Sequence, residues 1–156
     1  MKRSLRTLLF SSLVLCAGPV LADAPVAQYE QFVSATTTIR DTKTVLEWQR
    51  FAPRDKKDFA AAEAACPATF RVPTVKELLT LVDEQPHQEY DITLAKTVTK
   101  MIDQNAFGSY TAEDAAYWSS TPTGTPGERW GVSFRDGTMV RLVEGQPFYT
   151  RCVKSG

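Results

Sequence analysis

The sequence predicts a single α+β domain, and three observations carry this prediction. A β-branched stretch with a central turn opens the folded part of the chain, two helical stretches follow, and the last third alternates apolar with polar residues around tight turns. This order of elements is typical of an α+β fold. We expect two main helices packed on antiparallel strands, with a C-terminal β-meander.

Residues 36–50, TTTIRDTKTVLEWQR, predict a hairpin of two short strands. Leu46 and Trp48 alternate with polar neighbours, and a polar turn separates the two strands. The alanine-rich residues 54–66, RDKKDFAAAEAAC, predict the first helix, which Pro67 ends.

Residues 70–83, FRVPTVKELLTLVD, predict the second helix. Thr74 and Glu77 have the spacing of a capping box, in which each side chain bonds the backbone of the other residue. The apolar residues of this stretch share one helical face: Val75, Leu78, Leu79 and Val82.

Residues 83–116 form a polar insertion in which a few apolar residues suggest a third short helix: Leu94, Val98, Met101 and Ile102. The last third of the chain reads as strands. WGVSF alternates large apolar residues with small ones, as a strand does, and the dipeptide Asp136-Gly137 marks a hairpin turn. TMVRLV is then the returning strand of this hairpin, and FYTRCV is expected to add a further strand.

The first residues of the chain have the features of a secretory signal peptide. A basic start precedes an apolar stretch too short for a membrane span, and small residues fit cleavage after Ala22 or Ala24. We therefore expect an exported protein, periplasmic or secreted to the cell surface. The expected organisation is a signal peptide, a loosely held leader and one folded domain: residues 1–22, 23–36 and 37–156.

Charge and cysteine content narrow the class of protein. Cleavage after Ala22 removes three of 18 basic residues, so 15 basic and 18 acidic residues leave a net charge of −3. This excludes a global attraction to nucleic acid or anionic membranes, and no membrane insertion is expected after signal removal. Two cysteines survive, Cys66 and Cys152, and an even pair in an exported chain favours a disulfide. It would close a loop of 152 − 66 = 86 residues, worth on the order of 4 kcal/mol.

Six segments occur in the order found in the DUF1566 family: TVLEWQR, the cysteine that ends the first helix, FRVPTVKELLTLVD, YWSST, WGVSFRDG and YTRCV. The chain resembles this family, named for the C-terminal domain of the Legionella collagen-like adhesin, from about Thr37 to Val153. It departs from the family pattern at Phe70, where Trp is usual, and at Val72, where Leu is usual.

The resemblance carries implications for fold and function. The family is similar to the C-type-lectin-like fold, in which a disulfide commonly ties the first helix to the last strand. Cys66 and Cys152 occupy those two places. The resemblance implies a tendency toward surface recognition but implies no particular ligand.

The sequence contains few of the residue patterns that are typical of catalytic or metal-binding sites. His87 is the only histidine, so no Ser/His or Cys/His pair and no cluster of metal-binding His and Cys is evident. The calcium-binding signatures of lectin-like folds are absent, because Gln146-Pro147 is followed by Phe148, which cannot bind a metal. We expect a non-enzyme with no cofactor and no metal.

The stretch AAYWSSTPTG, residues 115–124, places two aromatic residues directly before three hydroxyl residues. We expect Tyr117 or Trp118 to pack in the core, with the hydroxyls bonded to neighbouring loop backbone. The alternative is an exposed platform on which a sugar ring stacks.

Candidate binding residues fall into two groups. Loops are where recognition residues vary while the scaffold holds, so we expect a partner at residues 83–116 and 122–129. The candidates there are Tyr110, Glu113, Asp114, Glu128 and Arg129.

The second group consists of arginines of the predicted meander: Arg129, Arg135, Arg141 and Arg151. Arg135 and Arg141 flank the hairpin and could form an anion patch suited to sulfated polysaccharide. The alternative is that these arginines pair with nearby acidic residues: Glu128, Asp136 and Glu144.

The function expected from the sequence is an exported, non-catalytic recognition module that binds a polysaccharide or protein ligand at the cell envelope or surface. Two alternatives are a structural subunit of a pilus or envelope assembly, and an enzyme related to sulfatase-modifying factors. The enzyme alternative needs reactive cysteines, whereas both mature cysteines are better assigned to a disulfide.

Overall fold

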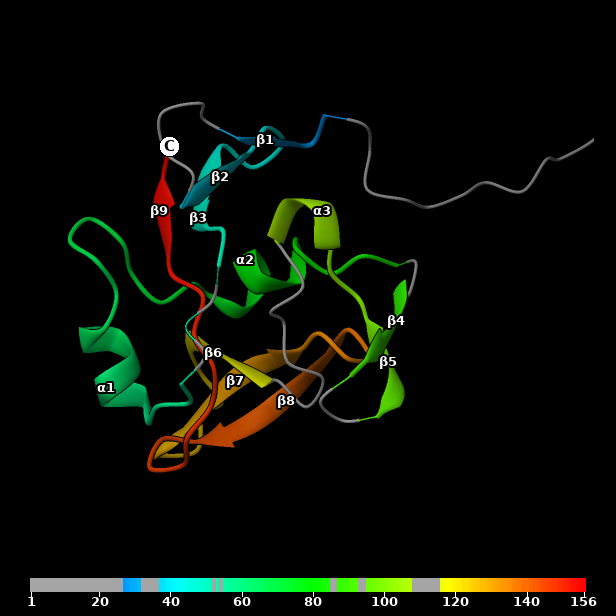
Figure 1. The fold of residues 1–156 in the computed structure, drawn as a ribbon. Coiled ribbons are helices and arrows are strands. Elements are labelled where there is room, and N and C mark those ends of the chain that lie inside the picture. The colour runs from blue at the N-terminus through cyan, green and yellow to red at the C-terminus, as the bar shows by residue number, and fades with distance from the viewer. Residues whose placement is uncertain are drawn as a thin grey trace, which may run out of the picture.

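The computed structural model describes residues 27–31, 37–51, 53, 55–84, 87–92, 95–107 and 116–156. These residues form three antiparallel sheets of four, two and three strands, with three short helices (Figure 1), which confirms the α+β class. The elements in chain order are β1 Tyr29–Gln31, β2 Thr38–Asp41, β3 Leu46–Gln49, α1 Phe59–Ala64, α2 Val75–Leu79, β4 His87–Asp91, β5 Lys96–Lys100, α3 Gln104–Phe107, β6 Ala116–Pro122, β7 Glu128–Ser133, β8 Thr138–Val143 and β9 Val153–Ser155.

The predicted N-terminal hairpin is confirmed as β2 and β3, which pair from Thr38 opposite Gln49 to Asp41 opposite Leu46. Asp41 closes the turn, because its carboxylate accepts hydrogen bonds from the backbone N–H of Lys43 at 2.9 Å and from the backbone N–H of the following threonine. The sheet has the order β1-β2-β3-β9.

Part of the segment expected to be a loose leader belongs to the folded body. β1 pairs with β2, and the ring of Tyr29 meets the ring of Phe107 edge-on with 5.0 Å between centroids. Tyr29 also packs against the main hydrophobic cluster. Within the described residues, β1 therefore packs with the sheet that contains β2.

The two main helices expected from the sequence are much shorter than predicted. α1 covers six residues and α2 five, and the described part of the chain contains no longer helix. The first helix begins only at Phe59 because Lys57 pairs with Phe148 in a β-bridge, while Asp58 caps the helix by accepting a hydrogen bond from the Ala61 N–H at 2.8 Å. α2 ends at Leu79.

The capping box that starts α2 is confirmed. The Thr74 hydroxyl accepts from the Glu77 N–H at 3.2 Å, and the Glu77 carboxylate accepts from the Thr74 N–H at 2.7 Å. Val75 and Leu78 are buried on the face that the sequence predicted. Because isolated helices this short are unstable in water, such caps and buried contacts hold α2 in place.

The helix expected around Val98 is wrong. Val98 lies in the middle of β5, opposite Glu89 of β4, and a short helix follows instead at α3. The alternation of buried Val98 with exposed Thr97 has the period of a strand, and β-branched residues favour strands. Leu94 lies outside the described residues.

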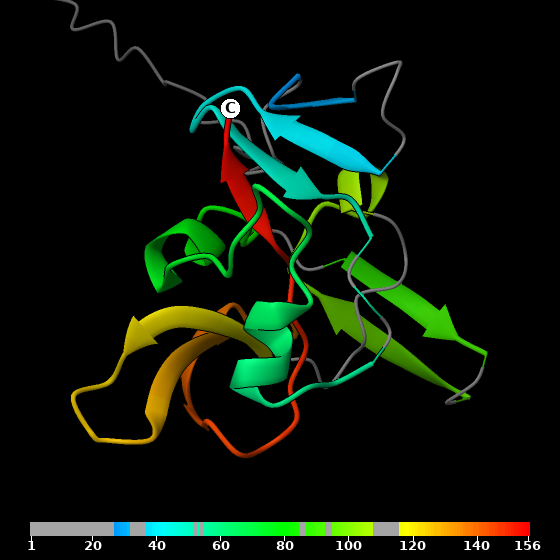
Figure 2. The same cartoon turned by 90° about the vertical axis from the view of Figure 1, so that its left-hand side faces the viewer.

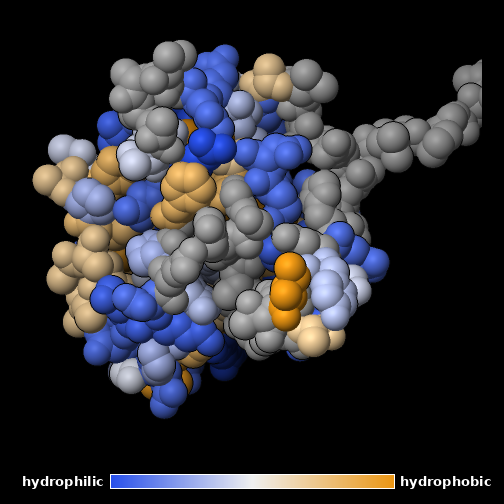
Figure 3. All heavy atoms as spheres, viewed as in Figure 1, coloured by the Kyte–Doolittle hydropathy of each residue, from blue (hydrophilic) through white to orange (hydrophobic). Residues whose placement is uncertain are grey.

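The β4–β5 hairpin stands out from the rest of the domain (Figure 2). Ile92, between its strands, is 87% exposed. Figure 3 shows hydrophilic residues over much of this face of the molecule, with apolar residues among them.

The predicted β-meander is present as β6, β7 and β8, with β7 in the centre. β7 and β8 pair in continuous register from Glu128 opposite Val143 to Ser133 opposite Thr138. Gly137, in the predicted turn, has a φ of 69°, a backbone conformation that glycine adopts without steric cost.

The expected further strand of the meander, FYTRCV, is wrong in its placement. Residues 148–150 run beside β6, where the Trp118 N–H donates to the Tyr149 carbonyl at 2.8 Å. The chain then crosses over, and β9 pairs with β3 in the N-terminal sheet. Figure 1 shows this last segment passing from the meander to the N-terminal sheet.

Two hydrophobic clusters lie on opposite faces of the meander. The larger contains Trp48, Leu78, Phe107 and Tyr117, among others. The smaller consists of Phe59, Ala62, Val72, Trp118 and Leu142.

The disulfide predicted from the sequence and the resemblance is present between Cys66 and Cys152, with 2.01 Å between the sulfurs. It joins the chain just after α1 to the residue before β9. No helix in the described part of the chain is long and apolar enough to cross a membrane.

Candidate binding site on the β-meander

The aromatic pair of AAYWSSTPTG is part of the core. Tyr117 and Trp118 are both fully buried. The Trp118 indole N–H donates to the Lys57 carbonyl at 2.8 Å, and its ring meets those of Phe59 and Phe148 edge-on, at 5.4 and 5.1 Å. No face of either ring is open to a sugar, so the platform interpretation of this stretch is wrong.

The hydroxyls that follow hold β6 against neighbouring backbone, as expected. The Ser119 hydroxyl donates to the Trp130 carbonyl at 2.6 Å, and the Ser120 hydroxyl donates to the Pro73 carbonyl at 3.2 Å. The Thr121 hydroxyl accepts from the Val75 N–H at 3.0 Å.

These bonds connect two of the segments on which the family resemblance rested, FRVPT and YWSST. Both segments therefore have a structural role.

An ion pair extends the same junction. Arg71 donates to both carboxylate oxygens of Glu77, at 2.8 and 2.7 Å, while Thr74 donates to that carboxylate from its N–H and its hydroxyl. The hydrogen bonds from Arg71, aided by those from Thr74, lower the pKa of Glu77 to about 2.

Arg151 is not part of a surface anion patch. Its side chain is fully buried, and one guanidinium nitrogen donates to the carbonyls of Gln49 and Arg50, each at 2.6 Å. The guanidinium also lies 4.7 Å from the ring centroid of Phe107. Burial lowers the pKa of Arg151 from its usual value. This arginine joins the C-terminal segment to the end of β3.

Arg129 contacts three other residues of its own domain. Its Nε lies 2.7 Å from Oε1 of Glu144, another nitrogen donates to the Ser120 carbonyl at 2.8 Å, and the guanidinium lies 3.7 Å from the ring centroid of Phe59. For this arginine the structure shows the expected pairing with a nearby acidic residue. Glu128 accepts a hydrogen bond from Thr123 at 3.4 Å.

The two loops expected to contact a partner, residues 83–116 and 122–129, join β6 at opposite ends. Ala116, where β6 begins, pairs with Ser133, whereas Pro122, where it ends, pairs with Arg129. The structure therefore does not bring the beginning of β6 together with the 122–129 loop. The candidates of the first loop lie outside the described residues: Tyr110, Glu113 and Asp114.

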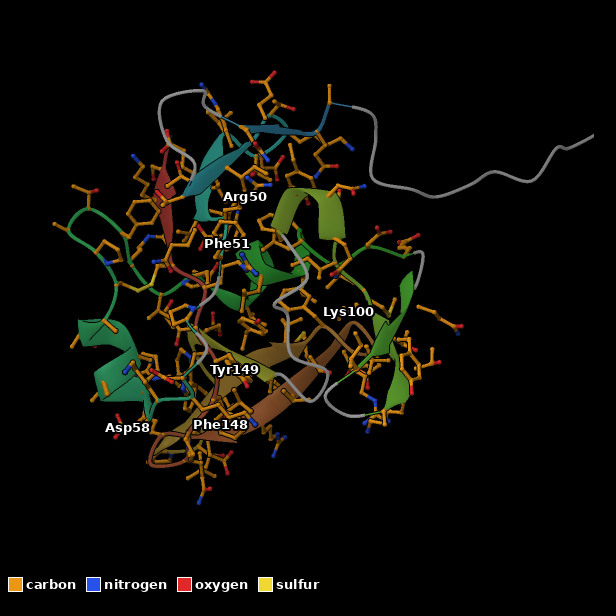
Figure 4. The ribbon with its side chains drawn as sticks, viewed as in Figure 1. Arg50, Phe51, Asp58, Lys100, Phe148 and Tyr149 are labelled. Atoms are coloured by element: carbon orange, nitrogen blue, oxygen red, sulfur yellow. A yellow bond between two sulfur atoms is a disulfide. The ribbon has the colours of Figure 1, made fainter. Side chains whose placement is uncertain are left out.

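The structure does bring Arg135 and Arg141 together. Both line an open hollow of about 380 Å³ beside the β7–β8 turn. The other residues that line it are Ala116, Ser133, Asp136, Val140, Leu142 and Phe148. Figure 4 shows Phe148 on the segment that passes beside the meander.

Arg141 differs from Arg129 in its surroundings. Its guanidinium lies 5.6 Å from the ring centroid of Trp130, and its side chain is exposed. No ion pair joins Arg141 to any residue in the described part of the chain. Glu144, one of the acidic residues expected to pair with these arginines, forms its ion pair with Arg129 instead.

The carboxylate of the hollow is held by local hydrogen bonds. Asp136 accepts from the Thr138 hydroxyl at 2.8 Å, and bonds from Thr138 and Ser133, together with the charge of Arg135, lower its pKa. The residues that line the hollow thus include two arginines, one ionised aspartate, a serine and four apolar residues. This combination suits a ligand with an acidic group on a partly apolar framework.

Sequence reasoning missed Phe148, Ser133 and Ala116 as members of this hollow. Phe148 was assigned to a meander strand, and its side chain reaches the hollow because it packs on Trp118. Nothing in the local sequence signals that contact. In the described part of the chain, no three His, Cys, Asp or Glu residues are grouped so that they could hold a metal ion.

Comparisons with known proteins identify one family. A family model described as the Lcl C-terminal domain, formerly DUF1566, matches residues 37–154. No curated protein and no solved structure matches the chain. The C-type-lectin-like fold thus stays a prediction.

Proposed function

The chain belongs to the Lcl C-terminal domain family, the domain type of the Legionella collagen-like adhesin, and we propose that it is an exported, non-catalytic recognition module for an acidic ligand. The ligand, a polysaccharide or a protein of the cell envelope or surface, places a carboxylate or sulfate at the edge of the hollow beside the β7–β8 turn. Arg135 and Arg141 bind this group.

One observation carries the proposal. Arg141, a residue at the edge of the hollow, keeps its guanidinium exposed near the ring of Trp130 and without an ion pair in the described part of the chain, while Arg129 is neutralised by Glu144. An exposed arginine held over an aromatic ring is preorganised to bind a planar acidic group.

Export is supported by the Cys66–Cys152 disulfide, because disulfides persist in oxidising compartments and are rare in the cytosol. The adhesin-type domain agrees with such a location.

The proposal is tested with the chain from residue 23 onward and four polymers: poly-L-glutamate, dextran sulfate, uncharged dextran and poly-L-lysine. Calorimetric titration should detect binding of the two polyanions only, and binding should weaken as salt rises because exposed charges are screened. The Arg135→Ala/Arg141→Ala variant should weaken polyanion binding about tenfold or more, since each lost charge-assisted contact is worth about 1 kcal/mol.

The matched control is Lys43→Ala/Lys76→Ala, which removes the same charge from exposed positions outside the hollow. This variant should bind as the unaltered protein does. Equal losses in both double variants would mean attraction by overall charge and would refute the site, as would a lack of polyanion binding.

A further inference from the structure

β8 is an edge strand of the meander, and no other strand in the described part of the chain pairs with its outer side. The sheet order is β6-β7-β8, and the Glu144 N–H donates to the Gly127 carbonyl at 2.9 Å. In an antiparallel pair alternate residues turn their backbone groups toward the partner, so the backbone groups of Met139, Arg141 and Val143 point away from β7.

Within the described part of the chain, a single backbone hydrogen bond reaches this outer edge. The Gln146 N–H donates to the Val143 carbonyl at 2.9 Å. The N–H and carbonyl groups of Met139 and Arg141 and the N–H of Val143 thus stay available to an additional strand.

The side chains of the same three residues are also exposed. Met139 and Val143 are 43% and 51% exposed, and Arg141 lies between them on the same face of β8. Native proteins usually shorten, twist or cover such edges, because an open edge pairs with other chains. β8 instead offers six paired residues in continuous register with an apolar–basic–apolar outer row.

We propose that β8 binds an extended polypeptide segment of a partner protein, which adds a fourth strand to the meander and places an acidic residue opposite Arg141. This inference rests on the proposed function and names its ligand class as protein. The backbone groups of Met139, Arg141 and Val143 supply the main-chain hydrogen bonds, as in other cases of strand addition.

The charge of Arg141 favours an acidic partner segment over a second copy of this chain at the outer edge of β8. A second copy that paired antiparallel through the same outward residues, with Met139 opposite Val143, would place its own Arg141 opposite Arg141, and like charges directly opposite each other are destabilising. An acidic residue at that position is attracted instead. Apolar residues on either side of it would cover Met139 and Val143.

The hollow adds specificity to the same strand. Side chains of a strand alternate between two faces, so residues of the added segment that do not face Arg141 turn toward the other face of the sheet. Val140 and Leu142 of β8 lie on that face and line the hollow together with Phe148. The hollow therefore receives alternate side chains of the bound segment.

The test uses a blocked peptide of sequence Ser-Val-Thr-Glu-Thr-Val-Ser, which presents the same pattern in either chain direction. Titration into the isotopically labelled protein should protect the amides of Met139, Arg141 and Val143 from hydrogen exchange. A peptide with Lys in place of Glu should bind about tenfold more weakly, because a cross-strand attraction becomes a repulsion.

Two substitutions at one position separate main-chain pairing from side-chain contact. Met139→Pro removes an outward N–H and blocks the approach of a strand without breaking a bond to β7, and proline is tolerated at strand edges. Met139→Ala removes the side chain and keeps the N–H. The proline variant should lose peptide binding at least tenfold more than the alanine variant.

A charge exchange keeps the test decisive if the proline variant fails to fold. Arg141→Glu should reverse the preference, so that the Lys peptide binds better than the Glu peptide. Binding with no protection of the three amides, or with unchanged preference in Arg141→Glu, would overturn the strand addition.

The outcomes also separate this inference from the proposed function. If Arg135→Ala/Arg141→Ala weakens binding of poly-L-glutamate and dextran sulfate but neither peptide binds, the recognition site stands and strand addition falls. If that double variant weakens nothing, both proposals fall.

Discussion

At the scale of single residues, four arginines near the C-terminus have the same chemistry and different surroundings. Arg151 is buried against backbone carbonyls, Arg129 is paired with Glu144, and Arg135 and Arg141 line the hollow. A guanidinium binds an external anion only where its own domain leaves it accessible. This is why the proposed site includes two of the four.

The first prediction concerns Trp118, which is fully buried between the rings of Phe59 and Phe148. Trp118→Ala should lower the free energy of unfolding by roughly 3 to 5 kcal/mol, because it truncates a large core side chain. Trp118→Phe keeps an aromatic ring and loses the hydrogen bond to Lys57, so it should cost less. Urea unfolding followed by circular dichroism measures both. An alanine variant with an unchanged midpoint would contradict the core role.

The second prediction concerns pH and Glu77. Its folded pKa of about 2 lies below the usual glutamate pKa of 4.5, so the stabilisation by the ionised carboxylate is complete above pH 4.5 and is lost as pH falls toward 2. Since Arg71 is nearly half exposed, we expect a loss of about 2 kcal/mol across this window.

Glu77→Gln should flatten the dependence of unfolding free energy on pH between 2 and 4.5. The control variant Glu63→Gln removes an exposed carboxylate of α1 and reports the effect of net charge alone. Identical pH slopes for Glu77→Gln and the unaltered protein would exclude the ion pair as the cause.

At the scale of elements, the meander depends on a close approach between its strands and the chain around them. Gly131 of β7 leaves no room for a side chain, since a Cβ there would lie 2.6 Å from the Tyr117 carbonyl oxygen and would collide with Leu142. Glycine in a strand often marks such an approach. The Tyr117 backbone and the Leu142 side chain therefore restrict this position to glycine.

The third prediction follows from that contact. Gly131→Ala should lower the unfolding free energy by about 2 kcal/mol or more, because a backbone oxygen cannot move aside as a flexible side chain can. Gly145→Ala is the matched control, because a Cβ at Gly145 would meet no atom within 4 Å. The melting temperatures of the two variants are compared by thermal unfolding. Equal melting temperatures would contradict the close approach of the Tyr117 carbonyl to Gly131.

At the scale of the whole molecule, the C-terminal segment joins the two larger sheets. It runs beside β6, forms the disulfide through Cys152 and ends as β9 next to β3. Cys66 lies at the other end of the bond, just after α1. One covalent link therefore connects the helix on the meander with the strand that completes the N-terminal sheet.

The fourth prediction tests this link. Cys66→Ser/Cys152→Ser opens a loop of 86 residues and should lower the unfolding free energy by about 4 kcal/mol, since the unfolded chain without the link gains conformational freedom. In the chain from residue 23 onward, no thiol should react before reduction. Two reactive thiols in the native, non-reduced protein would contradict the disulfide.

Features set by near neighbours could be predicted from the sequence. The β2–β3 hairpin, the capping box of Thr74 and Glu77, and the turn at Gly137 depend on residues a few positions apart, so local patterns identify them. The pairing of Cys66 with Cys152 followed from the number of cysteines and from the family resemblance.

Features set by distant parts of the chain could not be predicted in this way. The spacing of apolar residues around Val98 fitted a helix as well as a strand, and pairing with β4 settled it. β9 left the meander for the N-terminal sheet, and Arg151 found its acceptors about a hundred residues away, at Gln49 and Arg50. Which arginine is buried, paired or exposed depends on such contacts. They exist only after the chain has closed on itself, because their free energy comes from burying groups that the sequence keeps far apart.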